Sequence, residues 1–168
     1  GVNEVTLFRH FKSKDRLLAA VVGENFGEQP VAQRSASVPA LTADLRADLL
    51  ALVQHYDALL TENWPLVRAM LGEMHRHLPE SAEKQVFRAI FLPLKEAVLD
   101  RIESAQQTGQ IKRDQRVDVL ADLLLGAVFS GVLRRAIPHL KIDYSSATYL
   151  DAVVTTFLSG AATGQGRA

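Results

Sequence analysis

The sequence of 168 residues contains no cysteine and carries no formal net charge, and each absence excludes a class of protein. Without cysteine the chain cannot form a disulfide, a thiolate metal site or a cysteine nucleophile, and this composition suits a reducing compartment. The 19 basic side chains are balanced by 19 acidic ones, which argues against a general nucleic-acid coat. We therefore expect a cytoplasmic protein whose charged contacts are local.

Long apolar runs and enzyme motifs are also absent from the sequence. The longest apolar stretch, residues 119–133, is interrupted by Asp122 and is too short to span a bilayer, so no membrane partner is expected. There is no Gly-x-Ser-x-Gly elbow, His-Glu-x-x-His helix, phosphate loop or dinucleotide fingerprint. Glu73 and His77 are four residues apart, but zinc usually takes three or four ligands. We expect no enzyme, no metal and no cofactor.

Helical periodicity runs through most of the sequence. Apolar residues recur at spacings of three and four in segments that begin near residues 42, 63, 81, 116 and 145, and no segment makes a convincing strand. Pro93 is expected to kink or divide the third segment. The sequence therefore predicts an all-α fold. A loop at residues 27–41 divides a small head, residues 1–26, from a helical body, residues 42–168.

The head is predicted to contain two short helices with the chemistry of a DNA-binding unit. Asn3 suits the N-cap of the first helix, and Ser13 suits that of the second. Lys14 follows Ser13, where the helix dipole disfavours a cation unless an anion such as phosphate binds there. Opposite the apolar side of the first helix lie Val5, Thr6, Arg9 and His10, which can contact bases or phosphates. A solvated run of charges is the alternative.

This stretch resembles the recognition part of the TetR family of transcriptional regulators. The matching positions are Gly1-Val2, Thr6-Leu7-Phe8, Arg9-His10, Phe11 and Ser13-Lys14. The resemblance implies that Glu4, Val5 and Arg9 face base edges, and that Thr6, His10 and Lys14 hold phosphates. Family members often carry tyrosine at the position of Phe8, whose ring cannot donate a hydrogen bond to phosphate. The resemblance also implies a further helical segment before Gly1, so the sequence is expected to be a fragment.

Large apolar and aromatic side chains on several predicted helices are candidates for a small-molecule site. A cavity between helices is a common place for a ligand, although such side chains are also ordinary core residues. His77 lies at the edge of an apolar stripe and Arg101 falls within one, and these polar groups could orient a ligand. Equally, His77 could pair with Glu73, and Arg101 could extend along the surface. The candidate pocket residues are Tyr56, Trp64, Met70, Met74, His77, Phe87, Phe91, Arg101 and Phe129.

The last two predicted helices have more apolar surface than one packing partner can cover. The helix over residues 116–135 is apolar nearly all round, which favours pairing with a second copy, although a central core helix would have the same pattern. The TetR resemblance implies a homodimer in which the last two helices of each chain form a four-helix bundle. The candidate interface residues are Gly126, Ala127, Ser130, Gly131, Val153, Val154 and Phe157.

These patterns predict a ligand-responsive DNA-binding transcriptional regulator, acting as a repressor. Its partners would be a palindromic double-stranded DNA operator, a moderately apolar small-molecule effector and a second copy of the chain. A helical interaction or ligand-binding module without DNA binding would explain the body but not the polar face of the head. A helical enzyme is the third class, for which the sequence offers no motif.

Overall fold

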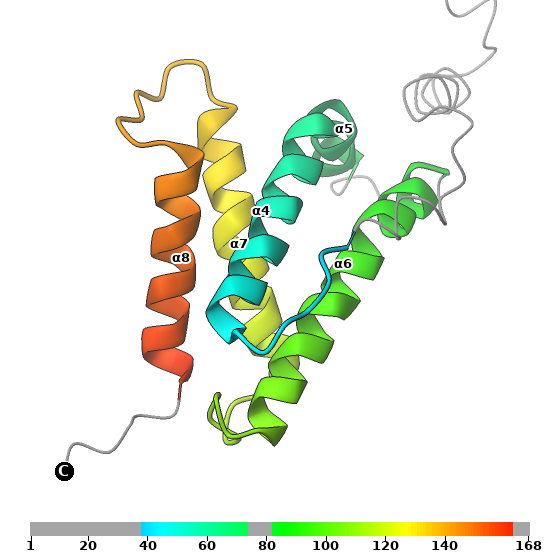
Figure 1. Cartoon of the computed structure of the whole chain (residues 1–168). Coiled ribbons are helices and arrows are strands. Elements are labelled where there is room, and N and C mark those ends of the chain that lie inside the picture. Colours follow the sequence, from blue (N-terminus) through cyan, green and yellow to red (C-terminus); the bar gives the residue numbers. More distant parts are fainter. Residues whose placement is uncertain (1–37, 74–81, 163–168) are drawn as a thin grey trace, which may run out of the picture.

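A computed structural model of the chain describes residues 38–73 and 82–162. This part contains α4 (Leu45–Glu62), α5 (Trp64–Glu73), α6 (Ala82–Gln107), α7 (Val117–Arg135) and α8 (Ser146–Ala161), as Figure 1 shows. The described residues form no strand, and Ile111 and Ala162 make an isolated bridge. The prediction of an all-α fold is therefore confirmed.

The helix boundaries follow from residues that are visible in the sequence. The Asp44 side chain accepts a hydrogen bond from the backbone N–H of Ala47 (3.0 Å), and Ser145 does the same for Thr148 (3.1 Å), so these residues cap α4 and α8. Pro65 lies in the first turn of α5, where its missing N–H costs little. Gly109 follows α6 with a φ of 77°, a conformation that glycine adopts without strain.

Of the two outcomes expected at Pro93, a kink or a division, the division does not occur, because α6 runs as one helix of 26 residues. Proline interrupts the hydrogen-bond ladder of an isolated helix. In the folded chain, however, residues on both sides of it are buried against neighbouring helices, and this packing holds the helix together. These residues are Phe91, Leu94, Val98 and Ile102.

α4 is the central helix of the described body. It packs against α5, α6, α7 and α8, and Figure 1 shows it in front of α7 with α6 and α8 on either side. Its residues Leu49, Leu52, Val53 and Leu60 are fully buried. Burying an aliphatic side chain of this kind contributes roughly 1.5–3 kcal/mol. The central position of α4 leaves α6, α7 and α8 to form the outer surfaces of the body.

Candidate ligand pocket and dimer surface

A hollow of about 410 Å³ lies between α4, α6 and α7, and we call it the inner pocket. Aromatic rings form much of its wall, and the Tyr56 and Phe91 rings meet edge to face with centroids 5.9 Å apart. Lys95 and Asp122 also line it and form an ion pair, in which the ammonium donates to Asp122 Oδ1 at 2.9 Å. The other lining residues are Leu92, Leu125, Gly126 and Phe129.

The structure brings some of the predicted pocket residues together and separates others. Tyr56, Phe91 and Phe129 line the inner pocket, whereas Trp64 packs against the core and is not part of the lining. Arg101 is buried in an ion pair elsewhere. Met70 and Phe87 belong to α5 and α6, but their side chains lie outside what the structure describes, as do Met74 and His77.

The sequence interpretation missed Leu92, Lys95, Asp122 and Leu125 as pocket residues. Lys95 and Asp122 are 27 residues apart and read as ordinary surface charges on two different helices. Leu92 is exposed and adjoins the buried Phe91, so its position next to an aromatic candidate was the available signal. The ion pair between Lys95 and Asp122, in contrast, depends on the packing of α6 against α7. No local sequence pattern predicts that packing.

Arg101 instead belongs to a buried polar cluster that joins the start of the body to α6. Its Nε donates to Asp48 Oδ2 at 2.6 Å, and the two side chains are only 5% and 1% exposed. The backbone N–H and the hydroxyl of Thr42 both donate to Asp48 Oδ1, at 2.8 and 2.7 Å. Burial alone would raise the pKa of Asp48, but the hydrogen bonds from Thr42 and Arg101 lower this pKa below its usual value. Asp48 is therefore a charged anchor at neutral pH.

A second hollow, of about 510 Å³, runs along the surface between α7 and α8, and we call it the outer groove. None of the described residues that line it carries a charge. On α7 its walls come from Leu120, Leu123, Leu124 and Ala127, and Leu123 is 63% exposed. Gln115 lies at one end, and the α8 side consists of Tyr149, Ala152, Val153, Thr156, Phe157, Gly160 and Ala161.

The predicted interface residues divide between different surroundings. Ala127, Val153 and Phe157 line the outer groove, and Gly126 lines the inner pocket instead. Val154 is fully buried in the core, while Ser130 is exposed but does not line the groove. An interface along the groove would therefore use only part of the predicted set. The small residues Ala152, Thr156 and Gly160, spaced by four on α8, were the signal in the sequence that could have located it.

Gly131 is occupied within the chain, by the ring of Tyr149. A Cβ on Gly131 would overlap Cε1 of that ring and lie 2.8 Å from Cδ1. The Tyr149 hydroxyl donates to the carbonyl of Ala127 at 2.7 Å, and its ring stacks on Tyr144 at 5.7 Å. The missing side chain of Gly131 thus lets α8 approach α7 in one chain.

The nearly continuous apolar surface of α7 reflects three different neighbours. Successive residues are about 100° apart round a helix, so Ala121 and Val128 face the core. Leu120 and Ala127 face the outer groove, whereas Asp122 and Phe129 line the inner pocket on nearly the opposite side. One helix therefore separates a candidate dimer surface from a candidate ligand pocket.

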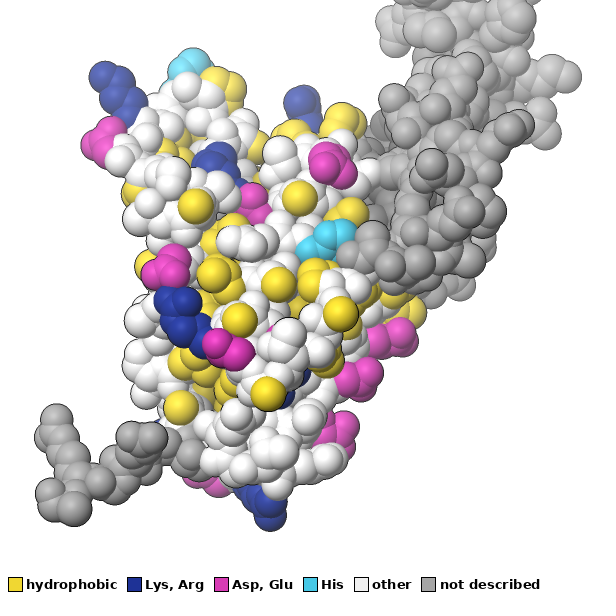
Figure 2. All heavy atoms as spheres, viewed as in Figure 1, with side chains coloured by type: hydrophobic (Ala, Val, Ile, Leu, Met, Phe, Trp, Pro, Cys, Tyr) yellow, Lys and Arg dark blue, Asp and Glu magenta, His cyan; other side chains and the backbone are white. Residues whose placement is uncertain are grey.

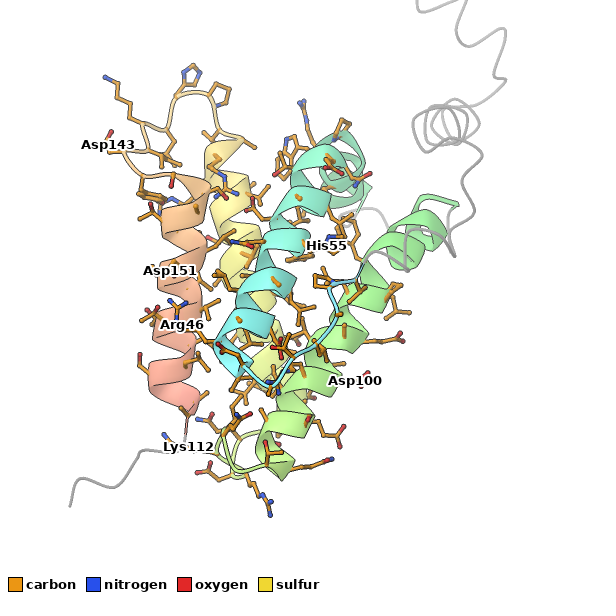
Figure 3. The ribbon with its side chains drawn as sticks, in the orientation of Figure 1. Arg46, His55, Asp100, Lys112, Asp143 and Asp151 are labelled. Carbon is orange, nitrogen blue, oxygen red and sulfur yellow. The ribbon has the colours of Figure 1, made fainter. Side chains whose placement is uncertain are left out.

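Polar contacts tie α8 to α4 along their seam. The Arg46 guanidinium of α4 points to Asp151 of α8 and donates to its Oδ1 at 2.7 Å, as Figure 3 shows. Figure 2 shows hydrophobic side chains at the surface along the same seam. Asp57 pairs with Arg135 and accepts a hydrogen bond from Ser146 at 2.9 Å. These contacts connect α4 with the two helices that carry the outer groove.

The predicted DNA-contacting residues, all within residues 1–14, lie outside the residues that the structure describes. Their roles remain predictions. Over residues 38–73 and 82–162, no cluster of three or more histidine or acidic side chains could hold a metal ion. None of the helices in these ranges has both the length and the apolar character needed to cross a membrane.

Comparison with known proteins identifies the family of the described body. A family model for the tetracycline repressor-like C-terminal domain matches residues 39–157, well over half of the chain. The matched span covers both the inner pocket and almost all of the outer groove. No curated protein matches the sequence. On the strength of the family match, the chain belongs to the TetR family of regulators, and residues 39–157 form its C-terminal domain.

Proposed function

We propose that this protein is a homodimeric, ligand-responsive transcriptional repressor, whose head reads a palindromic operator and whose body binds a small-molecule effector. The observation that carries this proposal is the match to the TetR C-terminal domain over residues 39–157. The arrangement of α7 agrees with it, because one side faces an apolar surface groove and the other a pocket of ligand size.

The outer groove is the proposed dimer surface. Exposed apolar patches of this kind mark interaction sites, and Val119, which lies one turn before Leu123 on α7, is also exposed. Because the described residues that line the groove are all uncharged, a second copy can cover them without burying an unpaired charge. The buried Oε1 of Gln115 has no hydrogen-bond partner among the described residues.

The hydrogen-bonded cluster of exposed Thr42 with buried Asp48 and Arg101 offers a route from effector to operator. α6 carries Phe91 of the inner pocket and, about 15 Å further along the helix, Arg101. Arg101 donates a hydrogen bond to Asp48, and Asp48 accepts another from the backbone N–H of Thr42. Thr42 follows directly after the segment that joins the head to the body. An effector that shifts α6 would thus favour another placement of the heads, one that no longer matches successive half-sites on DNA.

Replacing Leu123 with glutamate should convert a dimer into a monomer. Leu123 is 63% exposed, so the charge costs little in the single chain, but in the dimer it would be buried among apolar groups. Light scattering at micromolar concentration measures the result. The control is Leu92→Glu, because Leu92 is an exposed leucine of α6 outside the groove, and this variant should stay dimeric. A monomeric parent chain, or two equally dimeric variants, would contradict the proposed surface.

Arg9→Ala and Lys14→Ala should weaken operator binding in different ways. The operator can be isolated by retaining genomic fragments on the protein expressed from its complete gene. Arg9→Ala should cost about 1–3 kcal/mol and relax specificity, because a side chain that reads a base is lost. Lys14→Ala should weaken binding to all DNA sequences by a similar factor, and it should reduce the dependence of DNA affinity on salt concentration. Anisotropy titrations on operator and scrambled DNA at several salt concentrations distinguish these two effects. If the parent protein shows no preference for the operator, the alternative of a helical interaction module without DNA binding is favoured.

A further inference from the structure

The walls of the inner pocket are suited to a flat aromatic molecule. Tyr56 and Phe91 hold each other in an edge-to-face pair, and Phe129 adds a third ring from α7. Contacts between aromatic groups contribute about 0.5–1.5 kcal/mol beyond the burial of their area. The volume of about 410 Å³ lies in the lower part of the range for small-molecule sites, which suits a molecule of two fused rings.

Gly126 leaves part of the α7 backbone uncovered at the edge of this pocket. Gly126 is exposed, and a Cβ built on it would meet no atom within 4 Å, so the space above this part of α7 is open. A ring can therefore lie against the helix backbone here while it contacts the aromatic side chains of the pocket. A saturated ring system of the same size lacks the aromatic faces and edges that such contacts use.

The charges at the inner pocket cancel. Lys95 and Asp122 pair at 2.9 Å, and both side chains are largely exposed. A charged ligand would compete with one member of this pair for the other member. A hydroxyl, in contrast, can accept a hydrogen bond from Lys95 and donate one to Asp122. Burial raises the pKa of Tyr56 to about 12, so its phenol stays protonated at neutral pH. No hydrogen bond from this phenol to another described residue is present.

We propose that the effector of the inner pocket is an uncharged hydroxylated aromatic molecule of about two rings, whose hydroxyl bonds to the Lys95–Asp122 pair while its rings lie between the aromatic wall and Gly126. This inference rests on the proposed function, because it takes the inner pocket as the effector site.

Three probes of one shape test the chemistry by calorimetry on the chain. They are 2-naphthol, 2-naphthoate, which replaces the hydroxyl with a carboxylate, and 2-decalol, which keeps the hydroxyl but has saturated rings. We expect 2-naphthol to bind about five-fold more tightly than 2-naphthoate, because the carboxylate would be repelled by Asp122 and would compete with it for Lys95. It should also bind roughly two- to ten-fold more tightly than 2-decalol.

Two variants tie this binding to the inner pocket. Gly126→Leu places a side chain where a Cβ would meet no atom within 4 Å, so this variant should fold and dimerise normally while binding of 2-naphthol falls at least about ten-fold. Asp122→Asn leaves Lys95 without its counter-charge, so it should improve binding of 2-naphthoate about five-fold. Glu103→Leu is the control, because Glu103 is exposed on α6 and lines neither the inner pocket nor the outer groove; binding of 2-naphthol and dimerisation should both survive there.

The possible outcomes separate this inference from the proposed function. Tighter binding of 2-naphthoate or 2-decalol, unchanged binding in Gly126→Leu, or no binding of any probe would overturn the ligand class. Operator binding by the protein from its complete gene is measured separately, with and without 2-naphthol. If 2-naphthol binds as expected but does not alter operator affinity, the ligand class stands and the proposed switch fails.

Discussion

Replacing Asp48 with asparagine is expected to lower the free energy of unfolding by about 3–5 kcal/mol, because Arg101 would keep its charge in the interior without a counter-charge. The amide oxygen that replaces the carboxylate could still accept the hydrogen bonds from Thr42, so the loss would come mainly from the charge. Urea unfolding followed by circular dichroism measures the effect, at one fixed protein concentration because dimerisation would contribute to stability.

Asp151→Asn is the matched control for this prediction. Asp151 also pairs with an arginine, Arg46, at 2.7 Å, but both side chains are about half exposed. Exposed pairs of this kind contribute about 0–1 kcal/mol, so the control should change stability little. Adding Arg101→Leu to Asp48→Asn removes the unpaired charge and should recover part of the loss. If Asp48→Asn and Asp151→Asn lowered the free energy of unfolding by similar amounts, burial would not increase the contribution of the Asp48–Arg101 pair.

Acid should remove the stabilisation that the charged Asp48 side chain gives to the fold. The folded pKa of Asp48 lies below the ordinary value of about 3.9, so its hydrogen bonds and ion pair stabilise the fold fully above that pH. The stabilisation is lost as the pH falls through the folded pKa. The difference in unfolding free energy between the parent and Asp48→Asn should therefore be constant near neutral pH and narrow below about pH 4.

The helices could be predicted from the sequence because their signals are local. Asp44, Ser145, Pro65 and Gly109 mark helix ends through their own side chains or backbone preferences, and the apolar spacing gives the segments between them. α6 continues through Pro93, because packing on both sides of this residue outweighs the intrinsic cost of a proline. Local rules fail where tertiary contacts decide.

The site was only partly predictable, because spatial neighbours distant in the chain define it. Tyr56, Phe91 and Phe129 were found by size and character alone. The true partner of Arg101 is Asp48, 53 residues away, and no pattern within either helix reveals that pairing. Arg101 therefore looked like a polar group in an apolar stripe, when it is half of a buried ion pair.

α7 shows the same limit for a whole helix. When a helix is apolar on every side, its pattern does not indicate which face packs against the core. The sequence therefore could not predict which residues of α7 face the core, the groove or the pocket. The glycines of α7 looked alike in sequence, and both were predicted to lie at an interface with another chain. Gly126 faces open space in the inner pocket, while Gly131 is covered by Tyr149 of the same chain.

Alanine at these two glycines should therefore change stability in opposite directions. Gly126→Ala adds a methyl group that meets no atom within 4 Å, and alanine is favoured over glycine inside a helix by about 1 kcal/mol, so this variant should gain up to that amount. Gly131→Ala gains the same helix preference but forces the Tyr149 ring away from α7. Overpacking of this kind costs about 1–3 kcal/mol, and here it also strains the hydrogen bond from Tyr149 to Ala127.

Urea unfolding of both variants, each at the protein concentration of the parent, gives the sign and size of each change. Truncating the ring tests the cause. If the Tyr149 ring is the obstacle, Gly131→Ala should be less harmful in a Tyr149→Leu background than in the parent, and the double-mutant cycle should show a favourable coupling. A loss at Gly131 that persists without the ring, or equal changes at both glycines, would mean that the packing of α8 against α7 does not set the need for glycine at this position.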